Sequence, residues 1–415
     1  MLKLMTSLCV AAFVTLPLQA QTLVLEHAKV LTAGSAGELE DASIVIENGK
    51  IAAVGVAVTV PAGADIIDMT GRVITPGLVA ANTTLGVVEV NDRANANDSS
   101  AKTSDLSASV EIQYAVNPAS TLIPVARNGG ISRAIVTPGL GRGSLEKLSF
   151  GGQAAVIDTG AGQDPIILPH AGVTLNLRGV KTGRAAVFPM LKALLEDAAT
   201  YAAKETPGDM SGLTQKNWTL ADLEALAPVA RGEAPLIIEV DRASDISQML
   251  KIGKALNLKM VLVGAAEGWA VADEIADADA SVVLNPIDNL PSNFDQVQAS
   301  IENATRLNAA GVKLALTSNR DGHDVRLTRY HAGMAVANGL PYEDAIKAIT
   351  VNPARMFGDT TAGEIAVGQD ADIAVWSGDP LQPLTDLVVL YIGGEAQPKA
   401  DRQIILREKY MKSGE

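Results

Sequence analysis

The fold is decided by four apolar runs: Pro235-Leu-Ile-Ile-Glu-Val240, Lys259-Met-Val-Leu-Val-Gly264, Ala280-Ser-Val-Val-Leu-Asn285 and Val312-Lys-Leu-Ala-Leu-Thr317. Each run has the length and the β-branched content of a buried strand. Stretches with helical periodicity separate them, at 243–256, 269–278 and 294–310. This alternation is typical of parallel βα units. It continues over 76–358, a length that fits one TIM-like (β/α)8 barrel.

Both ends of the chain have a different pattern from the centre. Short β-like runs fill residues 21–75, with Asn48-Gly49 as a tight-turn signal between two of them. The C-terminal segment, 359–415, returns to β-like runs at 371–376 and 384–392 before a charged tail. We expect the two ends to meet and form one small composite β-sandwich beside the barrel.

Residues 1–20 have the pattern of a secretory signal peptide. Lys3 precedes a mostly apolar run, and Ala20 suits the position before a cleavage site. The run is shorter than the roughly 20 residues that cross a bilayer. The pattern predicts export to the periplasm or secretion, with no membrane span after cleavage. The single cysteine, Cys9, lies inside this segment, so the mature chain would have no disulfide and no thiolate ligand.

The charge balance narrows the range of partners. The formal net charge is −14, and an acidic chain repels phosphate backbones, so we expect no nucleic-acid partner. A small-molecule ligand remains compatible with this balance. No Gly-rich loop in the sequence is followed by the Lys-Ser/Thr of a phosphate-binding loop.

Three ordered motifs carry a family resemblance. Pro76-Gly-Leu-Val-Ala-Ala-Asn-Thr-Thr-Leu-Gly86 opens the predicted barrel, and Asn352-Pro-Ala-Arg355 followed by Gly363-Glu-Ile-Ala-Val-Gly-Gln-Asp-Ala-Asp-Ile-Ala-Val-Trp376 closes it. With the Asn48-Gly-Lys-Ile51 turn, they resemble the amidohydrolase superfamily. Within that superfamily the chain is similar to imidazolonepropionase-like proteins of Gram-negative bacteria. The resemblance implies a barrel with a terminal β-sandwich, and hydrolysis of non-peptide C–N bonds in cyclic amides or dipeptide-like substrates.

The resemblance also implies a divalent metal such as zinc, and here this sequence departs from the pattern. Asn82 and Thr84 stand where the first strand supplies two histidines, and Glu239 stands for the histidine of the fifth. The sixth-strand ligand falls near Gly264, and the catalytic Asp falls at Asn319. Amide and hydroxyl oxygens are weak, neutral ligands for zinc, and Asn cannot act as a general base. We therefore expect no metal cofactor and doubt the metal-water mechanism.

Two functions remain open. In the first, the chain is a hydrolase with a rebuilt site, whose catalytic candidates are Glu239, Asn319, Asp321 and His323. In the second, it is a non-catalytic binding or partner subunit, either a homo-oligomer or the companion of a related amidohydrolase.

The remaining pocket candidates are less specific. Asn82, Thr84 and His170 are candidate substrate-binding positions, by motif or because they follow a strand. Glu239 interrupts an apolar run, and a buried carboxylate needs a partner, for which Arg242 and Arg320 are the candidates.

Overall fold

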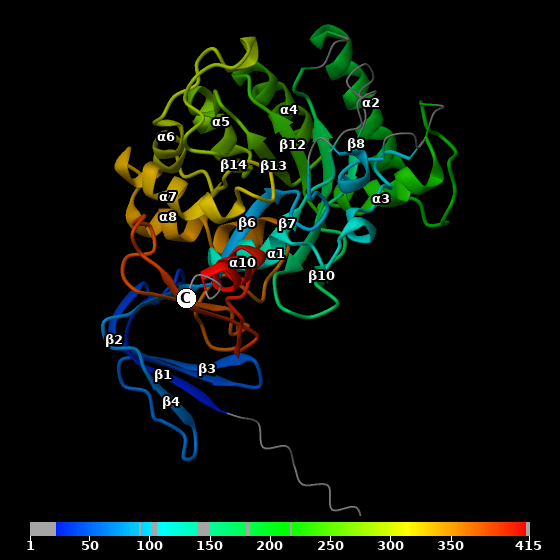
Figure 1. The fold of residues 1–415 in the computed structure, drawn as a ribbon. Helices are drawn as coiled ribbons and strands as arrows, with labels where there is room; N and C mark the ends of the chain where they lie inside the picture. The colour runs from blue at the N-terminus through cyan, green and yellow to red at the C-terminus, as the bar shows by residue number, and fades with distance from the viewer. Residues whose placement is uncertain are drawn as a thin grey trace, which may run out of the picture.

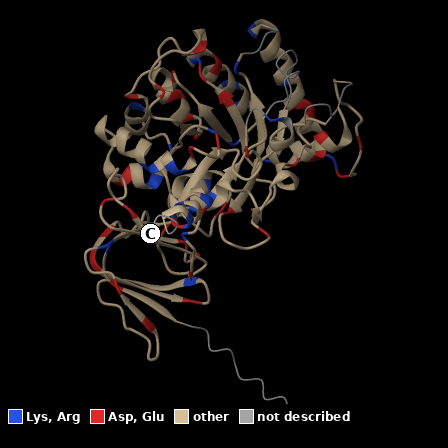
Figure 2. Cartoon of the chain, in the orientation of Figure 1, with Lys and Arg blue, Asp and Glu red and all other residues tan. Residues whose placement is uncertain are grey.

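The structure is a computed structural model that describes residues 22–90, 93–101, 106–139, 150–179, 183–215 and 218–411. The expected signal peptide, with Cys9, lies outside these residues. The molecule has two parts, a small terminal sheet and a larger strand–helix part (Figure 1). Asp and Glu residues are spread over both parts (Figure 2). No helix in the described ranges has both the length and the apolar character that a membrane crossing requires.

Strands from both ends of the chain share one eight-stranded sheet, in the order β18-β17-β16-β5-β1-β2-β3, with β4 paired to β1. The first five strands are β1 (Leu23–Leu31), β2 (Glu38–Glu47), β3 (Lys50–Gly55), β4 (Asp65–Asp68) and β5 (Val73–Pro76). The last three are β16 (Ile373–Trp376), β17 (Leu387–Ile392) and β18 (Glu395–Ala396). The antiparallel pairing of β5 with β16 joins the two ends.

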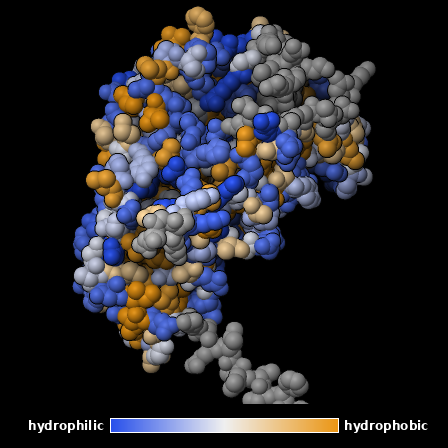
Figure 3. Space-filling model, viewed as in Figure 1, coloured by the Kyte–Doolittle hydropathy of each residue, from blue (hydrophilic) through white to orange (hydrophobic). Residues whose placement is uncertain are grey.

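The Asn48-Gly49 turn explains how this sheet starts. It links β2 to β3 with φ angles of 52° and 75°, the left-handed values that a tight hairpin turn requires. Leu25, Ile44 and Val375 are fully buried in the core of the sheet, while other apolar side chains remain visible on its surface (Figure 3). The pairings place all these strands in one sheet, so the two facing sheets of the expected sandwich are not confirmed.

The larger part contains a four-stranded sheet, β10-β9-β7-β6, and a six-stranded sheet, β15-β14-β13-β12-β11-β8. The first five of these strands are β6 (Leu78–Thr83), β7 (Ile131–Val136), β8 (Phe150–Gln153), β9 (Ala155–Asp158) and β10 (Ile166–Leu168). The others are β11 (Val173–Asn176), β12 (Leu236–Val240), β13 (Met260–Gly264), β14 (Ser281–Leu284) and β15 (Leu314–Leu316). Strands β11 to β15 are parallel neighbours, as the four apolar runs predict.

Two features separate this arrangement from the closed, all-parallel barrel that the sequence predicts. Strands β8 and β9 flank Ala154 and run antiparallel to β11 and β7, so one bent run belongs to both sheets. Among the described strands, no ladder joins β15 to β6. Instead, Thr317 Oγ1 donates to Ala81 O at 2.7 Å and Thr84 N donates to Arg320 O at 2.9 Å. The fold is therefore TIM-barrel-like α/β, with strand ladders that do not close the ring.

Helices cover the outside of these strands (Figure 1). They are α1 (Leu122–Asn128), α2 (Arg184–Ala202), α3 (Leu220–Ala230), α4 (Ala243–Ala255), α5 (Ala272–Asp277), α6 (Asn303–Ala309), α7 (Thr328–Ala337), α8 (Tyr342–Ala348), α9 (Val351–Met356) and α10 (Arg402–Met411). The helix expected over 294–310 is correct only from Asn303. Before it, Asn293 Oδ1 and Ser300 Oγ accept hydrogen bonds from nearby backbone amides, and such bonds compete with helix formation.

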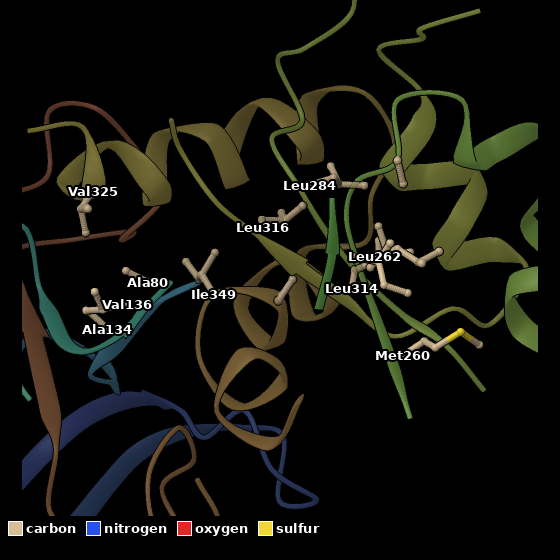
Figure 4. Close-up of a cluster of buried hydrophobic side chains, with 14 of the residues drawn as sticks. Ala80, Ala134, Val136, Met260, Leu262, Leu284, Leu314, Leu316, Val325 and Ile349 are labelled. Carbon is tan, nitrogen blue, oxygen red and sulfur yellow. The ribbon is translucent and has the colours of Figure 1, made fainter. Parts of the chain in front are cut away.

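The core between strands and helices is aliphatic, as the scarcity of aromatics requires. Ala80, Val136, Leu262 and Leu316 are all buried and lie on the strands of both sheets (Figure 4). This packing holds the C-terminal ends of the parallel strands at one end of the molecule, and it is this end that carries most of the candidate residues.

Candidate functional site

The mouth of the barrel-like part, where its parallel strands end, collects five residues that the motifs single out. Asn82 and Thr84 lie at the end of β6, Glu239 lies in β12, Gly264 ends β13 and Arg320 follows β15. Register explains the placement, because Glu239 pairs with Asn176 on one side and with Val263 on the other. The structure therefore brings the expected ligand positions to one place.

Arg178, which the sequence analysis missed, is the central side chain of the mouth. Asn176 Oδ1 accepts a hydrogen bond from its backbone amide at 2.7 Å and turns the chain just after β11. Its guanidinium contacts both carboxylate oxygens of buried Asp241, with Nε 2.8 Å from Oδ2 and Nη2 2.9 Å from Oδ1. Nη2 also donates to Val263 O at 3.1 Å. A paired arginine and carboxylate of this kind are among the stronger polar contacts in proteins.

The guanidinium of Arg178 occupies the space that a side chain at residue 264, here Gly264, would need. A Cβ atom at this residue would lie 1.6 Å from Arg178 Nη2 and 2.5 Å from Asp241 Oδ1, and its φ is +92°. The left-handed backbone therefore favours glycine, and any side chain here would have to push the guanidinium aside. The sixth-strand position at which the superfamily resemblance puts a histidine ligand holds the arginine head group instead.

Arg320 crosses the mouth from the opposite side. Its Nη1 donates to Glu239 Oε1 at 3.3 Å, and its Nη2 donates to Thr137 O beyond the end of β7. Arg178 Nη1 lies 3.9 Å from Glu239 Oε2. Of the two candidate partners of Glu239, Arg320 is the one that pairs with it. The other candidate, Arg242, precedes α4, where its carbonyl accepts the backbone amides of Asp245 and Ile246.

The two polar residues of β6 are already bonded within the chain. Asn82 has a φ of +55°, and its Oδ1 accepts a hydrogen bond from Thr137 Oγ1 at 2.7 Å. Thr84 Oγ1 donates to Arg320 O at 3.3 Å. Both side chains are buried, so they hold the two loops that meet across the mouth rather than facing open space.

The remaining catalytic candidates share one loop after β15. Asn319 Nδ2 donates to Asp324 Oδ2 at 2.9 Å, and His323 is exposed. Asp321 is partly buried in the same loop. Within the ranges that the structure describes, no group of three or more His, Cys, Asp or Glu side chains is placed to hold a metal ion.

His170 lies away from this site. It precedes β11 and is therefore at the opposite end of the strand from Asn176, and its Nε2 lies 2.9 Å from Glu111 Oε2. Burial alone raises the pKa of Glu111, but hydrogen bonds from His170 and Gln113 outweigh it and leave that pKa below its usual value. His170 follows a strand, as expected, but that strand, β10, pairs with β9 and leads directly into β11, so its end lies where β11 begins.

A small cavity of about 80 Å³ lies beside Arg178 under the loop that follows β14. Asp241, Gly264, Asp288, Gln296 and Asn303 contribute to its lining. Gln296 Nε2 donates to Asp241 Oδ2 at 2.9 Å and ties the loop to the ion pairs. Pockets for small molecules are commonly about 300–1,000 Å³, so this space suits water or a very small ligand.

Comparison with known proteins agrees with the motifs. The model of the amidohydrolase family matches residues 241–396. The chain is 24% identical to an imidazolonepropionase of Idiomarina loihiensis, over 88% of this chain and 94% of the relative. It is 26% identical to an imidazolonepropionase of Mycolicibacterium smegmatis, over 83% and 86%. It also matches the amidohydrolase tasK of Hapsidospora irregularis, of which it spans 34%.

The fold has solved counterparts. A crystal structure of an amidohydrolase from Thermotoga maritima aligns with a TM-score of 0.78 at 23% identity, over 90% of this chain and 99% of the other. That likeness supports the fold, while the full-length sequence matches and the family model support the lineage. The chain therefore contains a region that matches the amidohydrolase family and is similar over most of its length to the imidazolonepropionases.

Proposed function

We propose that this chain is a non-catalytic binding or partner subunit built on the amidohydrolase fold. The observation that carries the proposal is the guanidinium of Arg178, which fills the space above Gly264 and pairs with Asp241. The proposal extends to location and partners: a periplasmic or secreted protein that forms a homo-oligomer or pairs with a related amidohydrolase.

The residues at the mouth do not fit the divalent metal that is usual in the superfamily. Asn82 and Thr84 offer neutral oxygens that are already bonded to Thr137 and Arg320. The two nearest carboxylates, Glu239 and Asp241, face guanidinium groups. A divalent cation would have to displace these positive groups from the same oxygens, and like charges at such distances repel strongly.

A second candidate is hydrolysis of a C–N bond in a cyclic amide or dipeptide-like substrate. The similarity to imidazolonepropionases over most of both chains favours it. Its base would be Glu239, with Asp321 and His323 from the loop after β15. The geometry gives it less support, because the oxygens of Glu239 already face Arg320 and Arg178 rather than an open position for water.

The test is metal content and activity of the chain purified without its expected signal peptide and without a histidine tag. Zinc, manganese, iron and magnesium are offered, and bound metal is measured by mass spectrometry. We expect no stoichiometric metal and no turnover of a panel of cyclic amides and dipeptides. About one metal per chain that is lost in Glu239→Gln, but kept in the exposed control Glu233→Gln, would overturn the proposal. Metal-free turnover lost only in Glu239→Gln would establish the second candidate.

A further inference from the structure

A larger cavity lies at the opposite end of the parallel strands. Its volume is about 320 Å³, compared with about 80 Å³ at the mouth, and it reaches the size range of small-molecule pockets. Pro235, Met260 and Val261 form buried parts of its wall, and Met356 of α9 faces them. Met260 opens β13 and lies well away from Leu284 and Leu316, which lie at the other ends of their strands (Figure 4).

The charges around this cavity favour an anion. Its lining contains three cations, Lys259, Lys313 and Arg355, and two carboxylates, Glu233 and Asp279. This local excess of positive charge contrasts with the net charge of −14 for the whole chain. Cations that gather at a concave site attract anionic ligands from solution.

Both carboxylates already have partners. Asp279 Oδ1 lies 2.9 Å from Lys313 Nζ, and Glu233 Oε1 lies 2.9 Å from Arg231 Nε. Arg355 is also paired, since its Nη1 donates to Asp359 O at 2.8 Å and to Ala362 O at 3.1 Å, and its Nη2 lies 3.5 Å from Glu364 Oε1. Lys259 has no ion pair with any residue that the structure describes, and it is exposed at the rim. Its ammonium group is therefore the cation left for a ligand.

We propose that this cavity binds a small carboxylate that carries an apolar chain. The carboxylate lies at Lys259, and the apolar chain lies against Met260 and Met356. Flexible methionine side chains suit an apolar ligand of variable shape. The site is independent of the mouth, so it stands whether or not the mouth has a catalytic role.

The experiment is calorimetric titration of the full mature chain with hexanoate, with acetate and hexylammonium as the comparison ligands. We expect a dissociation constant for hexanoate on the order of 1 mM, and weaker binding of acetate, which cannot reach the methionines. Lys259→Gln should weaken hexanoate about fivefold, the range of one partly exposed charge pair. Lys251→Gln, an exposed lysine on α4 outside the lining, is the matched control and should bind like the parent chain.

Other outcomes overturn the inference. Absence of hexanoate binding, or equal binding of hexylammonium, would contradict an anion site. Tighter binding of inorganic phosphate than of hexanoate would remove the apolar part of the proposal. Binding that survives Lys259→Gln but disappears in Arg178→Gln would place the ligand at the mouth. As a control for folding, the unfolding temperatures of the lysine variants are measured. Unchanged values show that any loss of binding does not come from a loss of fold.

Discussion

The charged side chains at the two ends of the same parallel strands are arranged differently. At the mouth, buried carboxylates face guanidinium groups inside the chain, and about 80 Å³ of space remains. At the other end, the charges stand at the rim of an open cavity of about 320 Å³, with Lys259 left over. In TIM-barrel enzymes the C-terminal ends of the strands carry the chemistry. Here the charged side chains of the mouth pair with one another, while the end that normally only supports the fold has room for a ligand.

Gly264→Ala should have the largest effect, because a Cβ there meets the Arg178 guanidinium at 1.6 Å. We expect a loss of about 3–5 kcal/mol in the free energy of unfolding, because the strain of an L side chain at φ +92° adds to the loss of the Arg178–Asp241 pair when the guanidinium moves aside. Urea unfolding measures it. The control is Gly311→Ala, which has φ +85° but nothing within 4 Å, and should cost only about 1–2 kcal/mol. Equal losses in the two variants would mean that the mouth tolerates a side chain.

Arg178→Met should have the second-largest effect. We expect a loss of about 2–3 kcal/mol in the free energy of unfolding, because the change leaves Asp241 buried without its cation. The value is at the lower end of such effects, since the guanidinium itself is partly exposed and Gln296 still donates to Asp241. Arg231→Met, at an exposed ion pair, should change stability by less than about 0.5 kcal/mol. The same chemical denaturation compares both variants. A similar small loss for both would show that the mouth network contributes no more than a surface pair.

Acidification below neutral pH should destabilise the fold through a buried histidine on α7. Burial lowers the pKa of His331 on α7, whose Nδ1 has no hydrogen-bond partner in the described residues. The unfolded chain then binds the proton first, so stability is lost as pH falls below about 6.5, by at most about 1.4 kcal/mol per pH unit. Thermal unfolding between pH 5 and pH 8 checks this slope, which His331→Gln should flatten. An unchanged slope in that variant would exclude His331 as its source.

The smallest effect belongs to Glu111 beside His170. Because the pKa of Glu111 is lowered from 4.5 in the fold, its contribution is present above that pH and is lost as pH falls through the folded value. Glu111→Gln should therefore reduce the pH dependence of the unfolding temperature only below about pH 4.5, and by less than about 1 kcal/mol for so solvated a pair. A change near neutral pH would contradict this assignment.

The sequence predicted the elements that have a simple physical signature. The buried runs that became β12 to β15, the Asn48-Gly49 turn and the meeting of the two ends all depend on periodicity and turn chemistry. The cost of a buried charge predicted a cationic partner for Glu239, Arg242 or Arg320, and the partner is Arg320. These inferences needed only local pattern or one strong energetic rule.

The parts that the sequence did not reveal depend on tertiary context. The antiparallel run through Ala154 has the same composition as a parallel strand, so only its neighbours show its direction. Arg178 has no signal beyond its place two residues after a short strand, and its role depends on the space that Gly264 leaves. His170 followed a strand as expected, but that strand leads into the start of β11, so His170 lies at the opposite end of β11 from the mouth.

The pairing of β5 with β16 also has a consequence for the order in which the molecule forms. Trp376 Nε1 donates to Thr75 Oγ1 across 301 positions of sequence, so the terminal sheet cannot be completed until nearly the whole chain has left the ribosome. Contacts between such distant segments slow folding, because the chain loses the entropy of closing a long loop before the contacts stabilise it. The N-terminal strands therefore lack their C-terminal partner strands until synthesis is almost finished.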